Sequence, residues 1–265
     1  MQKFEQDYRE LILKVMIEGE ARKTRNAETI AIFGSSLSFD LRTDGFPLLQ
    51  GRKIFYKGVF GELAAMLRKP THIDDFTKWG CNFWGQWAED DGSINVDYGN
   101  AWFANHQIDK LKFMLANDPT NRRMMISGWR PDRLNNLSLP CCHYNYQFYV
   151  EQGNTLHMVW TQRSVDVMIG LPSDMVFAAA WLMAIANEFG FTAGSVKMDF
   201  GDTHIYTSHV TGVHDYLLQL LQANTIPIAS VYLGARGKDF CTFEPTDIEI
   251  LHYNPQPTIR FELHG

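Results

Sequence analysis

The chain has 265 residues and a formal net charge of −6 at pH 7, with 45% hydrophobic and 13% aromatic residues. This composition predicts a globular protein, and the length suits a single domain over residues 1–265 with a substantial core. The negative charge excludes a nonspecific nucleic-acid binder, whose affinity would come from neutralised phosphates. The longest apolar run, residues 175–186, is too short to cross a bilayer, so we expect no membrane association.

The cysteines predict a reducing environment. Cys81, Cys141, Cys142 and Cys241 lack the paired spacing of metal ligands, and no secretory leader precedes them. We therefore expect free thiols, no metal and a cytoplasmic location.

The first part of the chain predicts two helices and a short strand. Helical spacing of apolar residues predicts a helix over residues 4–16, ended by Gly19, and a strand at residues 29–33. Arg25 lies in the polar segment between them; such an arginine is usually solvated, although its planar fork suits a phosphate. A second helix covers residues 59–67, and Glu62 lies one position off its apolar stripe, where most glutamates border solvent.

The middle of the chain predicts an aromatic cluster, a helix and a strand. Trp84 and Trp87 belong to a cluster that forms either core or a stacking surface for a flat ligand. Residues 107–115 predict a helix, and residues 124–129 predict a strand that Arg122 and Arg123 open. Adjacent side chains of a strand point to opposite faces, so these two arginines are poorly placed to share a task within one chain.

The central stretch, residues 139–150, combines a half-buried strand with two thiols at its entrance. Its apolar and polar residues alternate, and residues 152–154 form the turn to a partner strand at residues 155–161. Cys141 and Cys142 follow Pro140, which cannot extend a sheet ladder. A thiol on a rigid lead-in suits a covalent nucleophile, but unpaired cysteines are usually small core residues. This stretch alone favours a core role.

The last third predicts a buried helix over residues 175–189, with Asp174 at its N-cap. Residues 201–206 predict a polar turn that puts His204 and Tyr206 on one face. A helix over residues 210–221, strands at 228–233 and 248–253, and a proline-marked tail complete the chain. The predicted class is α+β, with helices packed on a largely antiparallel or mixed sheet.

The ordered set of motifs resembles the thymidylate synthase family. The matching residues run colinearly through most of the chain: Arg25, Phe46-Pro47-Leu48, Glu62-Leu63, Trp84, Trp87, Tyr98-Gly99, Arg122-Arg123, Pro140 to His143, Gln162 to Asp166, Gly170-Leu171-Pro172 and Gly201 to Tyr206. The resemblance implies a homodimer that shares a sheet face, a deoxynucleoside monophosphate substrate and 5,10-methylenetetrahydrofolate as co-substrate.

The resemblance also implies roles for individual residues. Cys142, beside His143, would add to C6 of the pyrimidine, with Glu62 and Tyr98 moving protons. The implied substrate-binding residues are Arg25, Gln162, Arg163, Ser164 and Asp174, with His204 and Tyr206 at the sugar and Arg122 and Arg123 supplied by the partner subunit. The implied folate-binding residues are Trp84, Trp87, Leu139, Asp166, Gly170 and Ser173.

Three departures from the family pattern narrow the substrate and product. The family has an asparagine at the position of Asp174, where it recognises uracil; a carboxylate has only acceptors, so it suits the N4 amino group of cytosine and stabilises a protonated N3. An aspartate here resembles the phage dCMP hydroxymethylases. Ser173 replaces a phenylalanine that faces the folate. The tail, residues 261–265, lacks the small aliphatic ending that keeps water from the reaction, which predicts a looser, more polar lid.

We therefore predict a dCMP 5-hydroxymethylase, which suggests a virus that modifies its DNA and an enzyme in the host cytoplasm. The alternative is a dCMP 5-methyltransferase that yields dihydrofolate, which the retention of Trp84 and Trp87 favours. A thymidylate synthase acting on dUMP comes third. A catalytically idle nucleotide-binding homologue belongs to a different class, and the retained Cys142 argues against it. The residues leave open whether CMP is accepted beside dCMP.

Overall fold

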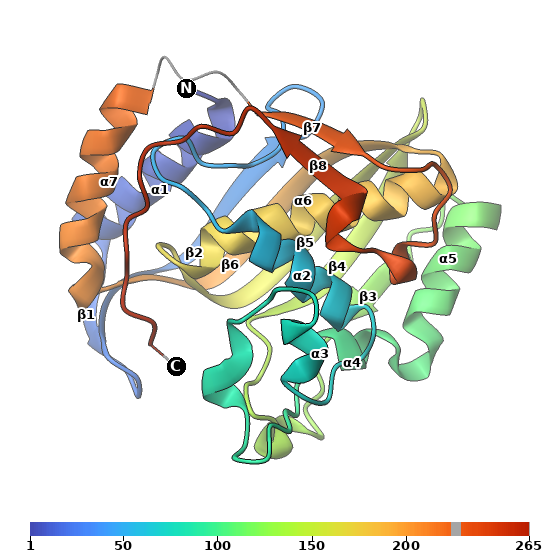
Figure 1. The fold of residues 1–265 in the computed structure, drawn as a ribbon, viewed down its shortest axis with the longest axis horizontal. Coiled ribbons are helices and arrows are strands. Elements are labelled where there is room, and N and C mark those ends of the chain that lie inside the picture. The colour runs from blue at the N-terminus through green and yellow to red at the C-terminus, as the bar shows by residue number, and fades with distance from the viewer. Residues whose placement is uncertain (224–228, 265) are drawn as a thin grey trace.

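The computed structural model describes residues 1–223 and 229–264, and its centre is a six-stranded mixed sheet (Figure 1). The strands are β1 (Glu20–Lys23), β2 (Glu28–Asp40), β3 (Met125–Ser127), β4 (His143–Glu151), β5 (Thr155–Asp166) and β6 (Thr192–Tyr206). Their order across the sheet is β1-β2-β6-β5-β4-β3, with β5 and β6 parallel and the other neighbours antiparallel. A small second sheet pairs β7 (Ser230–Leu233) with β8 (Ile248–Leu251). The predicted α+β class is confirmed.

Seven α-helices of the described residues accompany the sheet: α1 (Lys3–Glu18), α2 (Tyr56–Met66), α3 (Asp74–Thr77), α4 (Tyr98–Trp102), α5 (Gln107–Asn117), α6 (Gly170–Phe189) and α7 (Val210–Ala223). Helix α6 packs on β5 and β6 and against α2, so it lies between the sheet and an outer helix (Figure 1). Its sequence is apolar nearly all round, as a central buried helix requires. Within the described part of the chain, no helix has the length and apolar character needed to cross a membrane.

The strand register gives the sheet one packed face and one open face. Leu37, Met198, Trp160, Tyr146 and Ile126 pair in a row across β2, β6, β5, β4 and β3, and all five are buried. Because successive side chains alternate between faces, the next row points the other way.

That outward row consists of Ser38, Lys197, Val159, Gln147 and Met125, and its members are exposed or half-buried. We call the side of the sheet that carries it the open face. The packed face holds the core, and the open face is available to a partner.

The structure lengthens several predicted strands. The short strand at residues 29–33 is the first part of β2, which runs to Asp40, and β1 pairs with it, so the polar segment around Arg25 is a hairpin turn. Residues 201–206 are not a turn, as predicted, but the end of β6. Pairing with β2 and β5 overrides the local polar sequence there, because both neighbours supply ladder hydrogen bonds.

Two other placements were wrong. Asp174 is not an N-cap, because α6 already begins at Gly170 and Asp174 lies inside the helix. Arg122 and Arg123 lie in a turn before β3 rather than on the strand itself. The strand predicted near residues 228–233 is described only from 229, and residue 228 lies outside the described residues.

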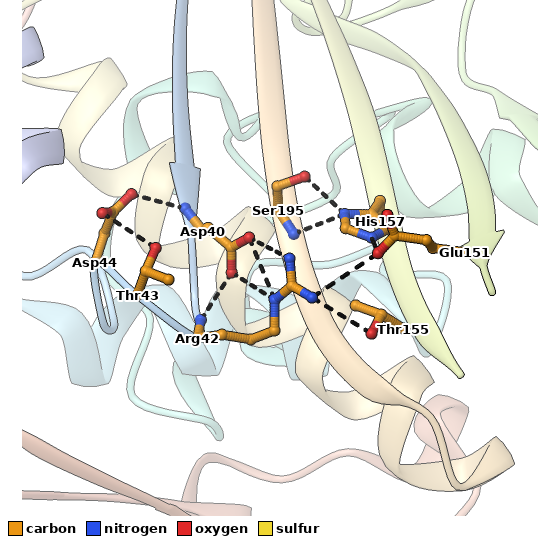
Figure 2. Close-up of polar contacts among 8 residues, drawn as sticks. All are labelled: Asp40, Arg42, Thr43, Asp44, Glu151, Thr155, His157 and Ser195. Carbon is orange, nitrogen blue, oxygen red and sulfur yellow. Dashed lines mark hydrogen bonds and ion pairs between the residues drawn. The ribbon is translucent and has the colours of Figure 1, made fainter. Parts of the chain in front are cut away.

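A polar network links the ends of four strands (Figure 2). It lies at the opposite end of β4 from Cys142. The Arg42 guanidinium donates to Asp40 over 2.6 Å, and its Nη1 lies 3.9 Å from Glu151. His157 Nε2 lies 3.3 Å from Glu151, and its Nδ1 lies 2.7 Å from the Ser195 hydroxyl. These contacts connect β2, β4, β5 and β6 at one end of the strands.

Candidate active site

The two adjacent cysteines have different surroundings. Cys142 is half-buried just before β4, and its Sγ lies 3.9 Å from Arg163 Nη2. Burial raises the pKa of the Cys142 thiol, while the Arg163 charge opposes the rise. Cys141 is buried, its Sγ lies 3.8 Å from the Gly128 carbonyl, and burial raises its pKa to about 12. The core interpretation therefore suits Cys141, whereas the Cys142 sulfur is in direct contact with the Arg163 guanidinium.

Arg163 also holds the segment that carries the thiol. Its Nε donates to the Cys141 carbonyl over 2.8 Å, and Nη2 donates to the Pro140 carbonyl over 3.0 Å. The guanidinium remains exposed, so it keeps N–H groups for a ligand.

Tyr98 and His143 fix the other side of the Cys142 backbone. The buried Tyr98 hydroxyl accepts a hydrogen bond from the Cys142 N–H over 2.8 Å. His143 is buried, with Nδ1 2.5 Å from the Tyr146 hydroxyl, and burial lowers its pKa to about 3. His143 is thus a neutral imidazole at pH 7 and has no charge to stabilise a thiolate.

Glu62 is a half-buried acid that forms no salt bridge with a basic side chain of the described residues. It extends from α2, and the Trp84 indole N–H donates to its Oε1 over 2.8 Å. Burial raises its pKa to about 7, because the charged form loses hydration that one indole N–H replaces only in part. The half-buried Trp87 packs beside Trp84, with ring centroids 5.3 Å apart. Trp84 is therefore core and also orients Glu62.

Asp174 is a second acid of this kind. It projects from the first turns of α6, and Gln162 Nε2 donates to its Oδ2 over 2.8 Å. Burial raises its pKa to about 8, and the charges of Glu62 and Asp166 add to the rise. At pH 7 the side chain of the unliganded protein is therefore mostly a neutral acid, not the carboxylate that the sequence analysis assumed.

The register brings further predicted residues to the same end of the sheet. His143 pairs with Gln162, and Asp166 pairs with His204. Tyr206 pairs with Thr29, close to the β1–β2 turn that carries the exposed Arg25. His204 Nδ1 lies 2.7 Å from Asp202, and Ser164 lies opposite that aspartate on β5. Cys142, the two acids Glu62 and Asp174, and His204 and Tyr206 therefore come from different elements, the position just before β4, helices α2 and α6, and the end of β6.

Four of the predicted folate residues lie around the start of α6 or on the approach to the thiol. Asp166 Oδ1 accepts the N–H groups of Met168 and Ile169, and the Ser173 hydroxyl donates to the Ile169 carbonyl over 3.3 Å. A Cβ at Gly170 would lie 3.8 Å from Asp174 Oδ2, so glycine keeps the space beside that acid open. Leu139 is half-buried ahead of Pro140.

Within one chain, Arg122 and Arg123 do not join this group. They are exposed in the turn before β3, and Met125, two residues after Arg123, pairs with Gln147 in the middle of β4, five residues after Cys142. Their predicted action in a partner's site stays a prediction.

The C-terminal tail is polar, as predicted, but it is anchored rather than loose. His209 Nε2 lies 2.7 Å from the Glu262 carbonyl, and His264 Nε2 lies 2.8 Å from the Ser208 hydroxyl. The His264 ring also packs on Tyr206, with centroids 4.3 Å apart. Gly265 lies outside the described residues. The tail therefore reaches Tyr206, one of the residues predicted to bind the sugar, and His264 supplies the contact.

Sequence reasoning missed Trp160, whose indole N–H donates to Gln162 Oε1 over 3.0 Å. The available signal was spacing, since residues two apart on a strand share a face. It also missed Tyr146, which holds His143.

Comparison with known proteins identifies the family of the chain. The family model described as thymidylate synthase matches residues 6–264. The thymidylate synthase of Corynebacterium aurimucosum is 29% identical over 268 aligned positions, covering 98% of this chain and 97% of the relative. The chain belongs to the thymidylate synthase family, whose members transfer a one-carbon unit from a folate to a pyrimidine nucleotide.

Proposed function

We propose that the chain is a dCMP 5-hydroxymethylase. It would take a one-carbon unit from 5,10-methylenetetrahydrofolate, attach it to C5 of dCMP and add water to give 5-hydroxymethyl-dCMP and tetrahydrofolate. The observation that carries the proposal is Asp174, an acid on α6 that Gln162 orients at the Cys142 end of the sheet. The family has an asparagine at this position, so the substitution changes how the base is recognised.

The protonation of Asp174 suits cytosine chemistry. As a neutral acid it donates to N3 of cytosine and accepts from the N4 amino group. When a thiolate adds to C6, N3 becomes strongly basic, and the proton moves from Asp174 to N3. The products are a neutral N3–H adduct and the Asp174 carboxylate, and the hydrogen bond between them becomes charge-assisted only as C6 is attacked, so the gain falls on the transition state. A pKa raised to about 8 keeps this proton available at pH 7.

Cys142 forms the covalent bond to C6. Its raised pKa means that the thiol predominates in the unliganded protein, so ionisation must accompany attack. Arg163, 3.9 Å away, stabilises the developing thiolate. Glu62 and Tyr98 transfer protons to and from the base. A pKa of about 7 lets Glu62 act both as a proton donor and as a proton acceptor at neutral pH. When bound, the folate supplies the electrophilic carbon.

The nucleotide is held at its other end by cations and hydroxyls. Arg25, Arg163 and Ser164 would bind the phosphate, where several guanidinium groups give charge-assisted hydrogen bonds to one dianion. His204 and Tyr206 would hold the sugar 3′-hydroxyl.

We also propose a homodimer through the open face. Its row includes Met125, which is 43% exposed, and the neighbouring Tyr149 of β4, which is 63% exposed. A face-to-face pair would bury these side chains and bring Arg122 and Arg123 toward the partner's site.

Mixing inactive Arg123→Ala protein with inactive Cys142→Ser protein should restore activity, because one of the two sites in the mixed dimer is intact. If activity does not return although subunit exchange is confirmed, the proposal that each site contains residues of both subunits is wrong.

The anchored tail supports a second candidate, a dCMP 5-methyltransferase. Tail contacts through Glu262 and His264 would help exclude water from the site. Hydride transfer from the folate would then replace the addition of water and give a methyl product. Mass spectrometry separates the two, because the hydroxymethyl product contains an additional oxygen and the methyl product forms together with dihydrofolate.

The deciding experiment offers dCMP and dUMP in turn to wild type and to Asp174→Asn, with Asp109→Asn on the exposed face of α5 as control. We expect wild type to prefer dCMP by about four orders of magnitude in kcat/KM, and Asp174→Asn to erase or reverse the preference. Asp109→Asn should match wild type. A wild-type preference for dUMP would make the chain a thymidylate synthase, and failure to trap a 5-fluoropyrimidine nucleotide on Cys142 would make it an idle homologue.

A further inference from the structure

A chain of two hydrogen bonds leads from the core to the acid that faces the base. The Trp160 indole N–H donates to Gln162 Oε1 over 3.0 Å, and Gln162 Nε2 donates to Asp174 Oδ2 over 2.8 Å. Trp160 is completely buried, and Gln162 is 2% exposed. Water therefore does not compete for the bond between Trp160 and Gln162, and the chain ends at the half-buried Asp174.

The order of donors along this chain is fixed by chemistry. An indole N–H is only a donor, so the oxygen of the Gln162 amide must face Trp160. The amide nitrogen must then face Asp174, and the side chain cannot flip without placing two donors against each other. Asp174 Oδ2 is therefore always an acceptor from Gln162, and a proton on the neutral acid belongs on Oδ1.

This polarity matters because a free carboxylic acid recognises both pyrimidines. With its proton on one oxygen it donates to N3 and accepts from N4 of cytosine. With the proton on the other oxygen it donates to O4 and accepts from N3–H of uracil. The nucleotide's position is set elsewhere, by the Cys142 bond and the phosphate residues. Only the choice of protonated oxygen then separates the two bases.

We propose that Trp160 is a positioning residue for base selection, because through Gln162 it fixes which Asp174 oxygen accepts and which donates. The inference rests on the proposed role of Asp174 as the residue that recognises the base. It does not depend on which base wild type prefers.

Trp160 also has packing partners that the test must separate. Its ring lies 4.3 Å from the His143 ring and 5.9 Å from the Phe177 ring, measured between centroids. A phenylalanine keeps an aromatic ring in this position and removes only the N–H and part of the volume.

The chain contains a matched control in Trp181 of α6. It is also completely buried, and its indole N–H has no hydrogen-bond partner among the described residues. Trp181→Phe therefore removes the same atoms from the same core without breaking a hydrogen bond.

The experiment measures kcat/KM for dCMP and dUMP in wild type, Trp160→Phe and Trp181→Phe, with Tm and the rate of Cys142 alkylation alongside. We expect the ratio of the two kcat/KM values to move toward one by about tenfold or more in Trp160→Phe, the scale of one buried hydrogen bond. In Trp181→Phe the ratio should stay at the wild-type value even if Tm falls.

Gln162→Met, which cuts both bonds, should relax the ratio at least as far and covers the case in which Trp160→Phe fails to fold. An unchanged ratio in the folded variants, or an equal change in Trp181→Phe, would overturn the positioning role. A wild-type preference for dUMP would overturn the proposed dCMP activity, while the relaxation of the ratio would still test Trp160.

Discussion

Two groups of acidic side chains, near opposite ends of strands β4, β5 and β6, have different hydrogen-bond partners and different pKa shifts. At the network end, a hydrogen bond from Arg42 holds the pKa of Asp40 below its ordinary value, and Glu151 has Arg42 and His157 beside it (Figure 2). At the thiol end, burial raises the pKa of Glu62 to about 7 and that of Asp174 to about 8. Neutral donors, Trp84 and Gln162, are their hydrogen-bond partners.

The difference in hydrogen-bond partners distinguishes acids that stabilise the fold from acids suited to proton transfer. A paired carboxylate near the surface lowers the free energy of the folded state slightly at neutral pH. A buried acid without a cation costs stability once it ionises, so its presence needs another explanation, and a raised pKa suited to proton transfer supplies one. Glu62 and Asp174 therefore stabilise the fold less than paired acids do at neutral pH, and their raised pKa values suit the proton transfers proposed for them.

The largest effect should follow removal of the nucleophile. Cys142→Ser should lower kcat by roughly three orders of magnitude or more, because a serine hydroxyl without a dedicated base is a poor nucleophile at neutral pH. Cys141→Ser, one residue away in the core, should keep most of the activity and lose some stability. Steady-state kinetics and thermal melts on both variants test this. An equal loss of kcat would count against Cys142.

A smaller effect concerns stability at the thiol end. The folded-state pKa of Asp174 lies above its ordinary value of 3.8, so the stability it contributes is fully present below pH 4 and is lost as the pH rises through about 8. Asp174→Asn should thus stabilise the unliganded protein at pH 8.5 by about 1–2 kcal/mol, which is roughly 2 to 8 °C in Tm.

The gain from Asp174→Asn should shrink toward pH 5. Melting curves across this range are the measurement, and a gain independent of pH would contradict a neutral Asp174.

The smallest effect belongs to the network end and has the opposite sign. The pKa of Asp40 is lowered in the folded state, so its stabilisation is present above pH 4 and is lost as the pH falls through the folded-state pKa. Asp40→Asn should cost about 0.5–1 kcal/mol at pH 7 and progressively less as the pH falls below 4, without changing kcat. A change in kcat would show that the two ends are coupled, and the comparison would fail.

Sequence patterns predicted much of this framework for identifiable reasons. Alternation around Tyr146 and Phe148 predicted β4, because one face of that strand is buried. The apolar run after Asp174 predicted the central helix. The adjacent Cys142 and His143 and the colinear motifs predicted the family, which the comparisons confirm.

What escaped prediction depends on tertiary partners. Residues 201–206 look like a turn by composition, but pairing on both sides makes them a strand. Asp174 resembles a cap when the helix is assumed to begin at Met175, and Pro172 is tolerated in the first turn, where its missing N–H has no role. The neutral state of Asp174 follows from burial, which a linear pattern does not encode.

Arg163 contacts both the backbone that carries Cys142 and the Cys142 sulfur itself, so a substitution at this position changes two contacts at once. Its guanidinium hydrogen-bonds the carbonyls of Pro140 and Cys141 and also lies beside the Cys142 sulfur. Lysine keeps the charge but has a single nitrogen, so it cannot serve both carbonyls and the sulfur from one fixed plane. A weaker affinity for phosphate in such a variant would therefore arrive together with a displaced thiol. With the phosphate role proposed for Arg163, a substitution at this position would therefore change nucleotide affinity and thiol reactivity together.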